Sequence, residues 1–385
     1  LKTCPLTGKR SRFGPRNECV RMSKFELPLR ADLQGQSPYG APVDLVPVRL
    51  NVNENPYPPS ESVVAAISAA VGTAAREVNR YPDRDAVELR AVLADYLNHE
   101  SGVKIAPERI WAANGSNEIM SQLFSAFGGP GATALTFDPT YSMYPEYARD
   151  SFTKMVSIPR RADFTVDIEL AIGEIASHAP NLVILASPNN PTGTLIELVE
   201  IEKIVIAAGE VGALVVIDEA YAEFRREKNA TAVKLLDTYP NVVVSRTMSK
   251  AFGYAGGRLG YCAVSEERIV QALKLVRLPY HLSSISQAAA IAALGFAQES
   301  LARVHEITGG RVHVASALAD LGVRVAPSDA NFLYFGEFVD AHLIWKSLLE
   351  QGILVRETGP SGWLRVSIGT PSENDQFIQS MRAIV

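Results

Sequence analysis

The sequence predicts an α/β protein in which a large domain, with a mostly parallel central sheet covered by helices, is followed by a smaller α+β domain. Between residues 80 and 280, short apolar runs alternate with helical patterns, which is typical of strands joined by crossover helices. After residue 299 the pattern changes to a long helix followed by short strands. The length of 385 residues allows two domains that share an interface.

Several apolar runs of the large domain are too apolar to be half exposed, as expected for strands that are covered on both faces. The runs are residues 132–137, 181–186, 213–217, 241–246 and 260–264. Between them, residues 117–127 place apolar side chains along one face of a helix. These side chains are Ile119, Met120, Leu123, Phe124 and Phe127. We therefore assign residues 80–280 to the large, cofactor-binding domain.

The smaller domain is predicted from the residues that flank the large one. The elements expected after the long helix are a strand at 331–335, a helix at 340–351 ended by Gly352, and strands at 353–357 and 363–369. Residues 52–79, with a helix that starts near Ser60, have no strand partner nearby and are assigned to the same domain. The predicted small domain is therefore 52–79 with 281–385, and an N-terminal arm at 22–51 precedes it.

The first 21 residues differ in charge from the rest of the chain. They hold six basic side chains against Glu18 alone, whereas the formal charge of the whole chain is −5. Without this +5 segment the remainder carries −10, and an acidic body is a poor partner for nucleic acid. Because the segment lacks an apolar core and Met22 follows it, we expect residues 1–21 to be a leader outside the fold, either an added extension or disordered. A short basic arm is the alternative.

Neither a metal site nor a membrane span is predicted. The three cysteines, Cys4, Cys19 and Cys262, have no metal-like spacing, and the six histidines form no paired motif. The longest apolar stretches are too short to cross a bilayer. A reducing, cytoplasmic environment fits this cysteine content best.

Three polar residues follow three of the buried strands: Asn190, Asp218 and Lys250. Their separations of 28 and 32 residues each correspond to about one strand, helix and strand. In a parallel sheet this spacing brings all three to the same carboxyl edge, where ligands of open α/β sheets bind.

The chemistry of these residue types points to pyridoxal 5'-phosphate. The amine of Lys250 can form a Schiff base with an aldehyde, and Asp218 beside a pyridine nitrogen would keep that nitrogen protonated. Tyr221 and Asn190 could bond the phenolic oxygen of the ring, and Tyr141 could stack on its face or be a core aromatic. Taken singly, Lys250 could also be a surface lysine, Asp218 a helix cap and Asn190 a turn residue. Their joint order and spacing favour the cofactor site.

A second group of residues suits a phosphate. Gly115 leads directly into a helix, so the backbone N–H groups of Ser116 and Asn117 are expected at its positive end. An ordinary helix start is the alternative. Ser249 and Arg258 flank the lysine and could supply a hydroxyl and a guanidinium to the same phosphate.

At these residues the sequence resembles the fold-type I aminotransferases, the aspartate aminotransferase superfamily. The segments that carry the resemblance are SPNNPTG (187–193), VVIDEAYAEF (215–224) and SRTMSKAFGYAGGRLGY (245–261). Further segments are similar to those of the actinobacterial type of histidinol-phosphate aminotransferases. They are LNVNENPYPP (50–59), NRYPD (79–83), AANGSNE (112–118), LPYHLS (278–283), SDANF (328–332), LVRE (354–357) and LRVSIG (364–369). The resemblance covers Met22 to Val385.

The resemblance implies a transferase of histidine biosynthesis that converts histidinol phosphate and 2-oxoglutarate to imidazole-acetol phosphate and glutamate. It also implies a homodimer with active sites at the subunit interface. Lys250 would carry the cofactor and then move the proton between the substrate Cα and the cofactor. Tyr81 would reach the cofactor phosphate of the partner subunit. Tyr57, Tyr280 and Asn331 match family positions near the substrate.

Two arginines are candidates for holding the anionic group of the substrate. Alternation along 363–369 places Arg365 on the face opposite Leu364, Val366 and Ile368, so its guanidinium projects away from the apolar face. A guanidinium there can hold a carboxylate or a phosphate by two hydrogen bonds. Arg356 could assist it, or form a surface salt bridge.

Other functions remain open at this point. An aromatic amino acid aminotransferase with 2-oxoglutarate as acceptor is similar along most of the chain, and a threonine-phosphate decarboxylase is a more distant relative. A regulator that senses a ligand would need a DNA-binding module, for which 21 leader residues are too few. A dehydrogenase would need a G-x-G-x-x-G motif after a first strand, and none is found.

Overall fold

A computed structural model describes residues 27–385 except 39, 41, 43, 228 and 229. The chain divides into two units, Leu1–Pro38 and Tyr39–Val385. The described part of the first unit holds one short 3-10 helix, η1 (Ala31–Leu33), and the helices and strands below belong to the second. The predicted leader, with Cys4 and Cys19, lies outside the described residues.

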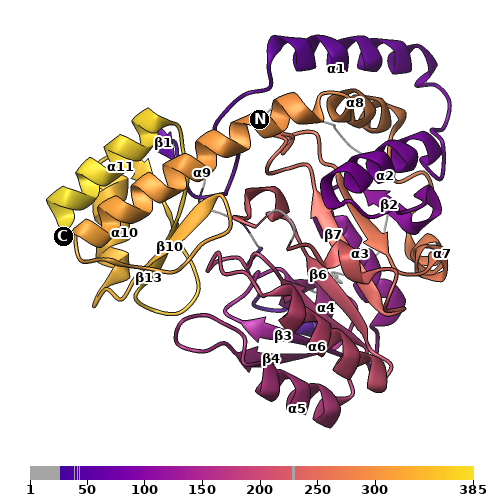
Figure 1. Ribbon diagram of the computed structural model, residues 1–385, viewed down its shortest axis with the longest axis horizontal. Helices are drawn as coiled ribbons and strands as arrows, with labels where there is room; N and C mark the ends of the chain where they lie inside the picture. Colours follow the sequence, from indigo (N-terminus) through magenta and orange to yellow (C-terminus); the bar gives the residue numbers. More distant parts are fainter. Residues whose placement is uncertain (1–26, 39, 41, 43, 228–229) are drawn as a thin grey trace, which may run out of the picture. The chain divides into compact units, whose positions relative to one another are not determined.

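Within the described part of the second unit, a seven-stranded sheet forms the centre of the large domain (Figure 1). Its strands in spatial order are β2 (Ile110–Ala113), β8 (Gly260–Val264), β7 (Val242–Thr247), β6 (Leu214–Asp218), β5 (Leu182–Ala186), β3 (Thr133–Asp138) and β4 (Lys154–Pro159). All neighbours are parallel except β8, which is antiparallel to both β2 and β7. The predicted fold class, with its mostly parallel sheet, is confirmed.

The direction of β8 follows from its connection to β7. Only turns join Thr247 to Gly260, so no crossover helix returns the chain to the opposite end of the sheet. The apolar run at 260–264, grouped in the sequence with the parallel strands, is therefore an antiparallel strand. Strands β2 and β4 have no counterpart among the predicted runs, because one is only four residues long and the other is an edge strand with mixed burial.

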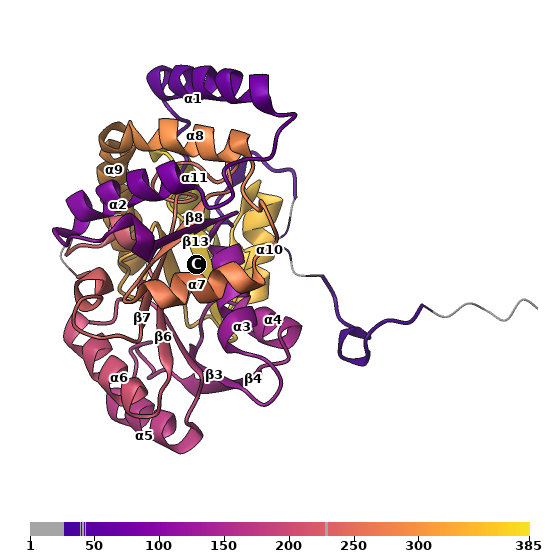
Figure 2. The same ribbon diagram turned by 90° about the vertical axis from the view of Figure 1, so that its right-hand side faces the viewer.

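Helices cover both faces of the sheet, which explains why its strands are apolar on both sides. Val183 and Leu185 of β5 belong to one core cluster, whereas Leu182 and Ile184 belong to the other. In Figure 2 the helices α5 and α6 lie on one side of the sheet and α3 and α4 on the other. The helices of the large domain are α2 (Val87–Ser101), α3 (Ser116–Phe127), α4 (Tyr144–Asp150), α5 (Ile168–His178), α6 (Leu198–Glu210) and α7 (Glu267–Val276).

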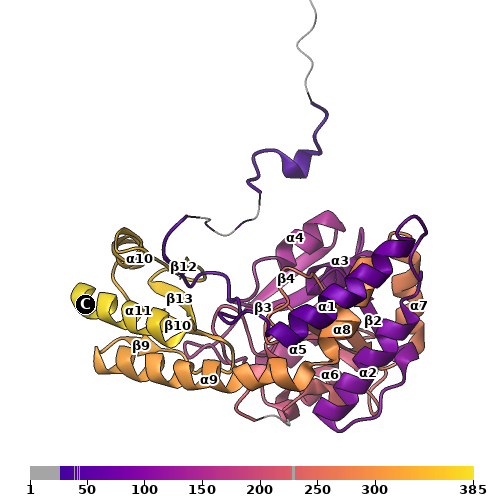
Figure 3. The ribbon, with the colours of Figure 1, turned by 90° about the horizontal axis from the view of Figure 1, so that it is seen from above.

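The C-terminal part of the chain forms a second, four-stranded antiparallel sheet. Its strands in order are β12 (Arg356–Glu357), β13 (Trp363–Ser367), β10 (Phe332–Gly336) and β9 (Arg324–Val325). Around it lie α9 (Ala297–Asp320), α10 (Ala341–Glu350) and α11 (Pro371–Ile384), and α9 runs from the large domain to this sheet (Figure 3). Strand β1 (Val48–Arg49) pairs in parallel with β11 (Ile353–Leu354), so the chain just before residue 50 is attached to the small domain.

Helix α1 (Glu61–Ala74) begins where predicted, because the hydroxyl of Ser60 accepts a hydrogen bond from Val63 N and caps it. It packs against α8 (Ser284–Leu294), which in turn packs against α2 (Figure 1). The predicted boundary near residue 280 assigns α2 to the large domain and α8 to the small domain, although these two helices are in contact. The division into domains therefore stays a prediction. Among the described helices, none has the length and apolar character needed to span a membrane.

Candidate active site

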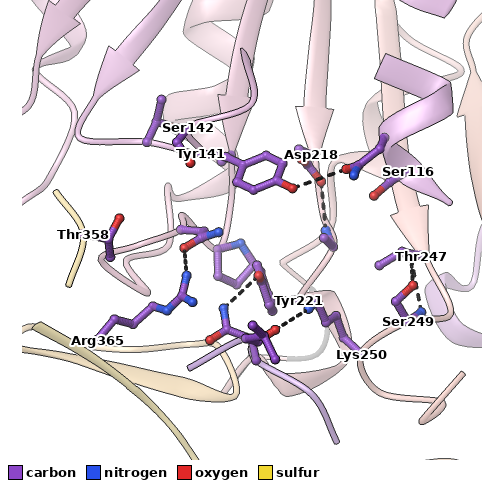
Figure 4. Close-up of a pocket in the computed structure, with 18 of the residues that line it drawn as sticks. Ser116, Tyr141, Ser142, Asp218, Tyr221, Thr247, Ser249, Lys250, Thr358 and Arg365 are labelled. Carbon is purple, nitrogen blue, oxygen red and sulfur yellow. Dashed lines mark hydrogen bonds between the residues drawn. The ribbon is translucent and has the colours of Figure 1, made fainter. Parts of the chain in front are cut away.

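A cavity lies at the carboxyl edge of the seven-stranded sheet and extends to the small sheet (Figure 4). Most of the residues that the sequence selected line it together. They are Ser116, Asn117, Tyr141, Asn190, Asp218, Tyr221, Ser249, Lys250, Arg258, Arg356 and Arg365. Residues from three strand ends therefore meet in one place, as their spacing predicts.

The amine of Lys250 points into this cavity three residues after the end of β7. Its Nζ donates a hydrogen bond to the carbonyl oxygen of Val52 over 3.1 Å. Burial lowers the pKa of this amine from 10.5 to about 8, and the nearby guanidinium groups of Arg365 and Arg258 act in the same direction. The amine is therefore partly neutral near neutral pH. Its place in the lining of the cavity argues against a solvated surface lysine.

Asp218 is the last residue of β6, and its carboxyl is buried. Burial raises its pKa from 3.8 to about 6. Two hydrogen bonds oppose this shift because they favour the carboxylate: the phenol of Tyr144 donates to Oδ2 over 2.9 Å, and Ala220 N donates to Oδ1 over 3.2 Å. A protonated ring nitrogen placed beside this carboxyl would supply the positive charge that such a buried anion requires.

The residues predicted to bind a phosphate meet at the N-terminus of α3. Gly115 has a φ of 85° and no side chain, and a Cβ there would lie 2.5 Å from Nη2 of Arg258. At Gly260 a Cβ would clash with the backbone nitrogen of Ser116, so strand β8 approaches the helix end closely. The two glycines thus allow a guanidinium and a helix N-terminus to lie side by side, as an anion requires. Ser249, which accepts a hydrogen bond from Arg258 Nη1 over 3.5 Å, completes this group.

Aromatic and amide side chains line the middle of the cavity. The phenol oxygen of Tyr221 accepts a hydrogen bond from Nδ2 of Asn53 over 3.0 Å. The phenol of Tyr141 donates to Oδ1 of Asn117 over 3.4 Å, and its ring lies edge-on to that of Tyr144. Tyr141 and Tyr221 therefore approach the same cavity from different elements (Figure 4).

The opposite end of the cavity is cationic. Arg365 of β13 is only 7% exposed; it donates through Nη1 to Oδ1 of Asn190 and through Nη2 to the carbonyl oxygen of Asn51 over 2.7 Å. Its direction away from the apolar face of β13 agrees with the predicted alternation. Arg356 lines the same end and donates to the carbonyl oxygen of Gly40. This end could hold an anion apart from the residues at α3 that are predicted to bind a phosphate.

Four predicted residues do not line the cavity in the single chain: Tyr57, Tyr81, Tyr280 and Asn331. The rings of Tyr81 and Tyr280 stack on each other with centroids 4.4 Å apart, and Tyr81 is 79% exposed. Asn331 is fully buried and donates through Nδ2 to the carbonyl oxygen of Asn53. The ring of Tyr57 lies under the guanidinium of Arg303.

Comparison with known proteins decides the family. A family model described as aminotransferase class I and II matches residues 46–381. The chain belongs to the aminotransferase class I and II family. The match spans all three sheets and every residue that lines the cavity, and the predicted resemblance to the aminotransferases is therefore confirmed.

Relatives within the family are similar over nearly their whole length. A histidinol-phosphate aminotransferase 3 of Burkholderia lata is 54% identical over 91% of this chain and 94% of its own. A histidinol-phosphate aminotransferase of Thermobifida fusca is 54% identical over 92% and 95%. Among solved structures, histidinol-phosphate aminotransferase from Sinorhizobium meliloti in complex with pyridoxal-5'-phosphate has a TM-score of 0.78 at 28% identity, covering 88% of this chain and 92% of its own.

Sequence reasoning missed several side chains that line the cavity of this aminotransferase. Tyr144 stands three residues after Tyr141, and Thr247 stands three residues before Lys250, so both lie inside segments already singled out. Residues 51–53 line the cavity although only Tyr57 was selected from their segment. Tyr144 and residues 51–53 reach the cavity through long-range contacts, which no local pattern marks.

Proposed function

We propose that this aminotransferase converts histidinol phosphate and 2-oxoglutarate to imidazole-acetol phosphate and glutamate in histidine biosynthesis, with pyridoxal 5'-phosphate bound at Lys250. The observation that carries the proposal is that one cavity joins a desolvated lysine, a buried carboxyl group, an anion site at a helix N-terminus and a second, cationic end. The names of the relatives that are about half identical over most of the chain support the substrate.

The residues present fit pyridoxal phosphate. Lys250 would bond the aldehyde carbon, Asp218 would hold the ring nitrogen, and the group at Gly115, Ser116 and Arg258 would hold the phosphate. When bound, this cofactor draws electrons from the substrate Cα and so makes its proton acidic. The solved relative from Sinorhizobium meliloti is described as a complex with this cofactor.

Lys250 is suited to moving a proton. A pKa of about 8 leaves part of the amine neutral near neutral pH, and only the neutral amine can bond an aldehyde or accept a proton. The carbonyl oxygen of Val52 accepts a hydrogen bond from Nζ and so orients the amine within the cavity. The lysine therefore combines a suitable pKa with a fixed position.

The cationic end would bind the group that distinguishes an amino donor. Arg365 is held by Asn190 and by the carbonyl oxygen of Asn51, so its guanidinium is oriented before a substrate arrives. Histidinol phosphate carries a phosphate and glutamate carries a carboxylate, and a guanidinium can bind either anion by two hydrogen bonds. One site must accept both donors because the two half-reactions share one lysine.

We further propose a cytoplasmic homodimer in which Tyr81 reaches the cofactor phosphate of the partner subunit. The exposed ring of Tyr81, stacked on that of Tyr280, is consistent with burial against a second chain. Mixing an inactive Tyr81→Phe variant with an inactive Lys250→Ala variant tests this. Mixed dimers that regain activity support the arrangement, and mixed dimers without activity contradict it.

The substrate is tested by measuring kcat/KM for histidinol phosphate and for phenylalanine, each with 2-oxoglutarate as acceptor. A preference for histidinol phosphate is expected, and a preference for phenylalanine would indicate an aromatic amino acid aminotransferase. The cofactor is tested separately by borohydride reduction of the protein loaded with pyridoxal phosphate. Loss of a visible absorption band with labelling of Lys250 is expected, and labelling elsewhere would contradict the role of this lysine.

A further inference from the structure

Three consecutive residues, Asn51, Val52 and Asn53, contact three different groups of the cavity; we refer to them as the 51–53 segment. The carbonyl oxygen of Asn51 accepts a hydrogen bond from Arg365, and that of Val52 accepts one from Lys250. Asn53 contributes its side-chain amide, whose Nδ2 lies 3.0 Å from the phenol oxygen of Tyr221. None of these contacts is part of a sheet or helix.

Asn53 is 1% exposed, and all of its polar groups are engaged. Its backbone N–H donates to Oγ of Ser367 over 2.8 Å, and the same hydroxyl donates back to Oδ1 of Asn53 over 3.0 Å. Its carbonyl oxygen accepts from Nδ2 of Asn331 over 3.1 Å. Asn53 therefore connects Tyr221 of the large domain to strand β13 of the small domain.

This network fixes which way the amide of Asn53 faces. The hydroxyl of Ser367 accepts the backbone N–H of Asn53 and donates its own proton to Oδ1 of Asn53. Nδ2 must then face Tyr221, and an amide nitrogen can only donate. Tyr221 is thus the acceptor in this contact, and its phenolic proton is not used in this bond.

We propose that Asn53 is a positioning residue that orients the hydroxyl of Tyr221 toward the cofactor and, through Ser367, couples it to the strand that carries Arg365. The proposal rests on the proposed function, because it requires pyridoxal phosphate in this cavity. In this role Asn53 acts through Tyr221 and not directly on the reacting atoms.

The expected effect follows from hydrogen-bond cooperativity. A phenol that accepts a hydrogen bond becomes a stronger donor, so Asn53 strengthens the bond that Tyr221 can give to the phenolic oxygen of the cofactor. A donor at that oxygen favours its anionic form and lowers the pH at which the bound chromophore loses its proton. Without the amide of Asn53, that pH midpoint should rise.

The choice of variants follows from the backbone. Asn53 has a φ of 56°, in the left-handed region that glycine and aspartate also tolerate. Asn53→Gly keeps this conformation and removes the amide. Asn53→Asp keeps the shape but replaces the donor by an acceptor, which would draw the proton of Tyr221 away from the cofactor. The two variants thus separate the amide from the backbone conformation.

The experiment is a spectroscopic pH titration of the visible band of the protein loaded with pyridoxal phosphate. For Asn53→Gly we expect the midpoint to rise by about 0.5 to 1 pH unit, the equivalent of one neutral hydrogen bond. For Asn53→Asp we expect a larger rise. In a Tyr221→Phe background, Asn53→Gly should cause no further shift, because the group through which it acts is absent.

A matched control separates positioning from general loosening. Asn241, at the amino end of β7 and away from the cavity, also uses its Nδ2 to hold two backbone carbonyls, those of Val205 and Ala213. Asn241→Ala should lower the melting temperature and leave the midpoint unchanged. Three outcomes would overturn the proposal. The midpoint could shift equally in the Asn241→Ala control, or it could stay unchanged in Asn53→Gly. The effect of Asn53→Gly could also be the same with and without the hydroxyl of Tyr221.

Failure of the proposed function has a different signature. If the wild-type protein incubated with pyridoxal phosphate develops no visible band, the cofactor assignment fails and the role of Asn53 fails with it. If the band forms and only the midpoint of Asn53→Gly stays in place, the cofactor assignment stands and the positioning role alone is wrong.

Discussion

The phenol of Tyr144 donates a hydrogen bond to Oδ2 of Asp218 over 2.9 Å, and both side chains are buried at the cavity. Because this bond favours the carboxylate, its loss should raise the pKa of Asp218 further above about 6. We expect Tyr144→Phe to lower kcat/KM about tenfold, as for one hydrogen bond to a charged group, and to move the acidic limb of the pH profile upward.

The same change on the next turn of α4 provides the control for this prediction. Tyr147 is buried and does not line the cavity, so Tyr147→Phe should leave the acidic limb in place. Equal pH profiles for the two variants would show that Tyr144 does not act on Asp218.

Lys250 should make the stability of the cofactor-free protein depend on pH. Its pKa is about 8 in the fold and 10.5 in an exposed lysine, so the unfolded chain binds more protons between these pH values and stability rises with pH there. Well below pH 8 the full penalty remains, and a shift of this size corresponds to about 3 to 4 kcal/mol at most. Lys250→Met removes the penalty.

We therefore expect the cofactor-free Lys250→Met variant to unfold at higher urea concentration than wild type at pH 7, and the difference to vanish toward pH 10. Lys346, on the exposed face of α10, serves as the control, because its replacement by methionine should give no difference that changes with pH. A difference for Lys250→Met that is constant from pH 7 to 10 would contradict the lowered pKa.

Gly115→Ala should weaken binding of the cofactor phosphate. The added Cβ would lie 2.5 Å from Nη2 of Arg258 and displace the guanidinium from the N-terminus of α3. We expect the Kd for pyridoxal phosphate to rise at least about tenfold, the value of one charge-assisted hydrogen bond. Titration of the visible band with cofactor measures this.

Gly102→Ala separates this clash from backbone strain. Gly102 ends α2 with a φ of 73°, close to the 85° of Gly115, and a Cβ there would meet nothing within 4 Å. Both variants should lose about 1 kcal/mol or more of stability from the left-handed backbone. Only Gly115→Ala should lose cofactor affinity. A comparable loss of affinity in Gly102→Ala would show that the clash with Arg258 is not the cause.

Arg246 should be required for folding stability. It is 1% exposed and forms ion pairs with Glu219 at 2.7 Å, Glu223 at 3.2 Å and Glu100 at 3.3 Å. Arg246→Met leaves these carboxylates partly uncompensated in the interior and should lower the free energy of unfolding by about 3 to 5 kcal/mol. Urea denaturation measures the loss. For comparison, Arg161 forms a surface ion pair with Asp167, and Arg161→Met should lower the free energy of unfolding by less than about 1 kcal/mol.

The sequence by itself determined five of the seven strands of the large sheet and the polar residues that follow three of them. Apolar runs mark β3, β5, β6, β7 and β8 because strands that are covered on both faces are mostly apolar. The positions of Asn190, Asp218 and Lys250 after such runs then place them at one edge by topology alone. These inferences succeed because each depends on a local pattern and a general rule of sheet architecture.

Only the tertiary structure decided how the cavity is completed. The contact of Asn53 with Tyr221 joins residues 168 positions apart, and that of Tyr144 with Asp218 joins residues 74 apart. The antiparallel direction of β8 likewise follows from a connection that lacks a crossover helix. Such contacts arise from the packing of separate elements, which fixes distances and hydrogen-bond directions that no local pattern encodes.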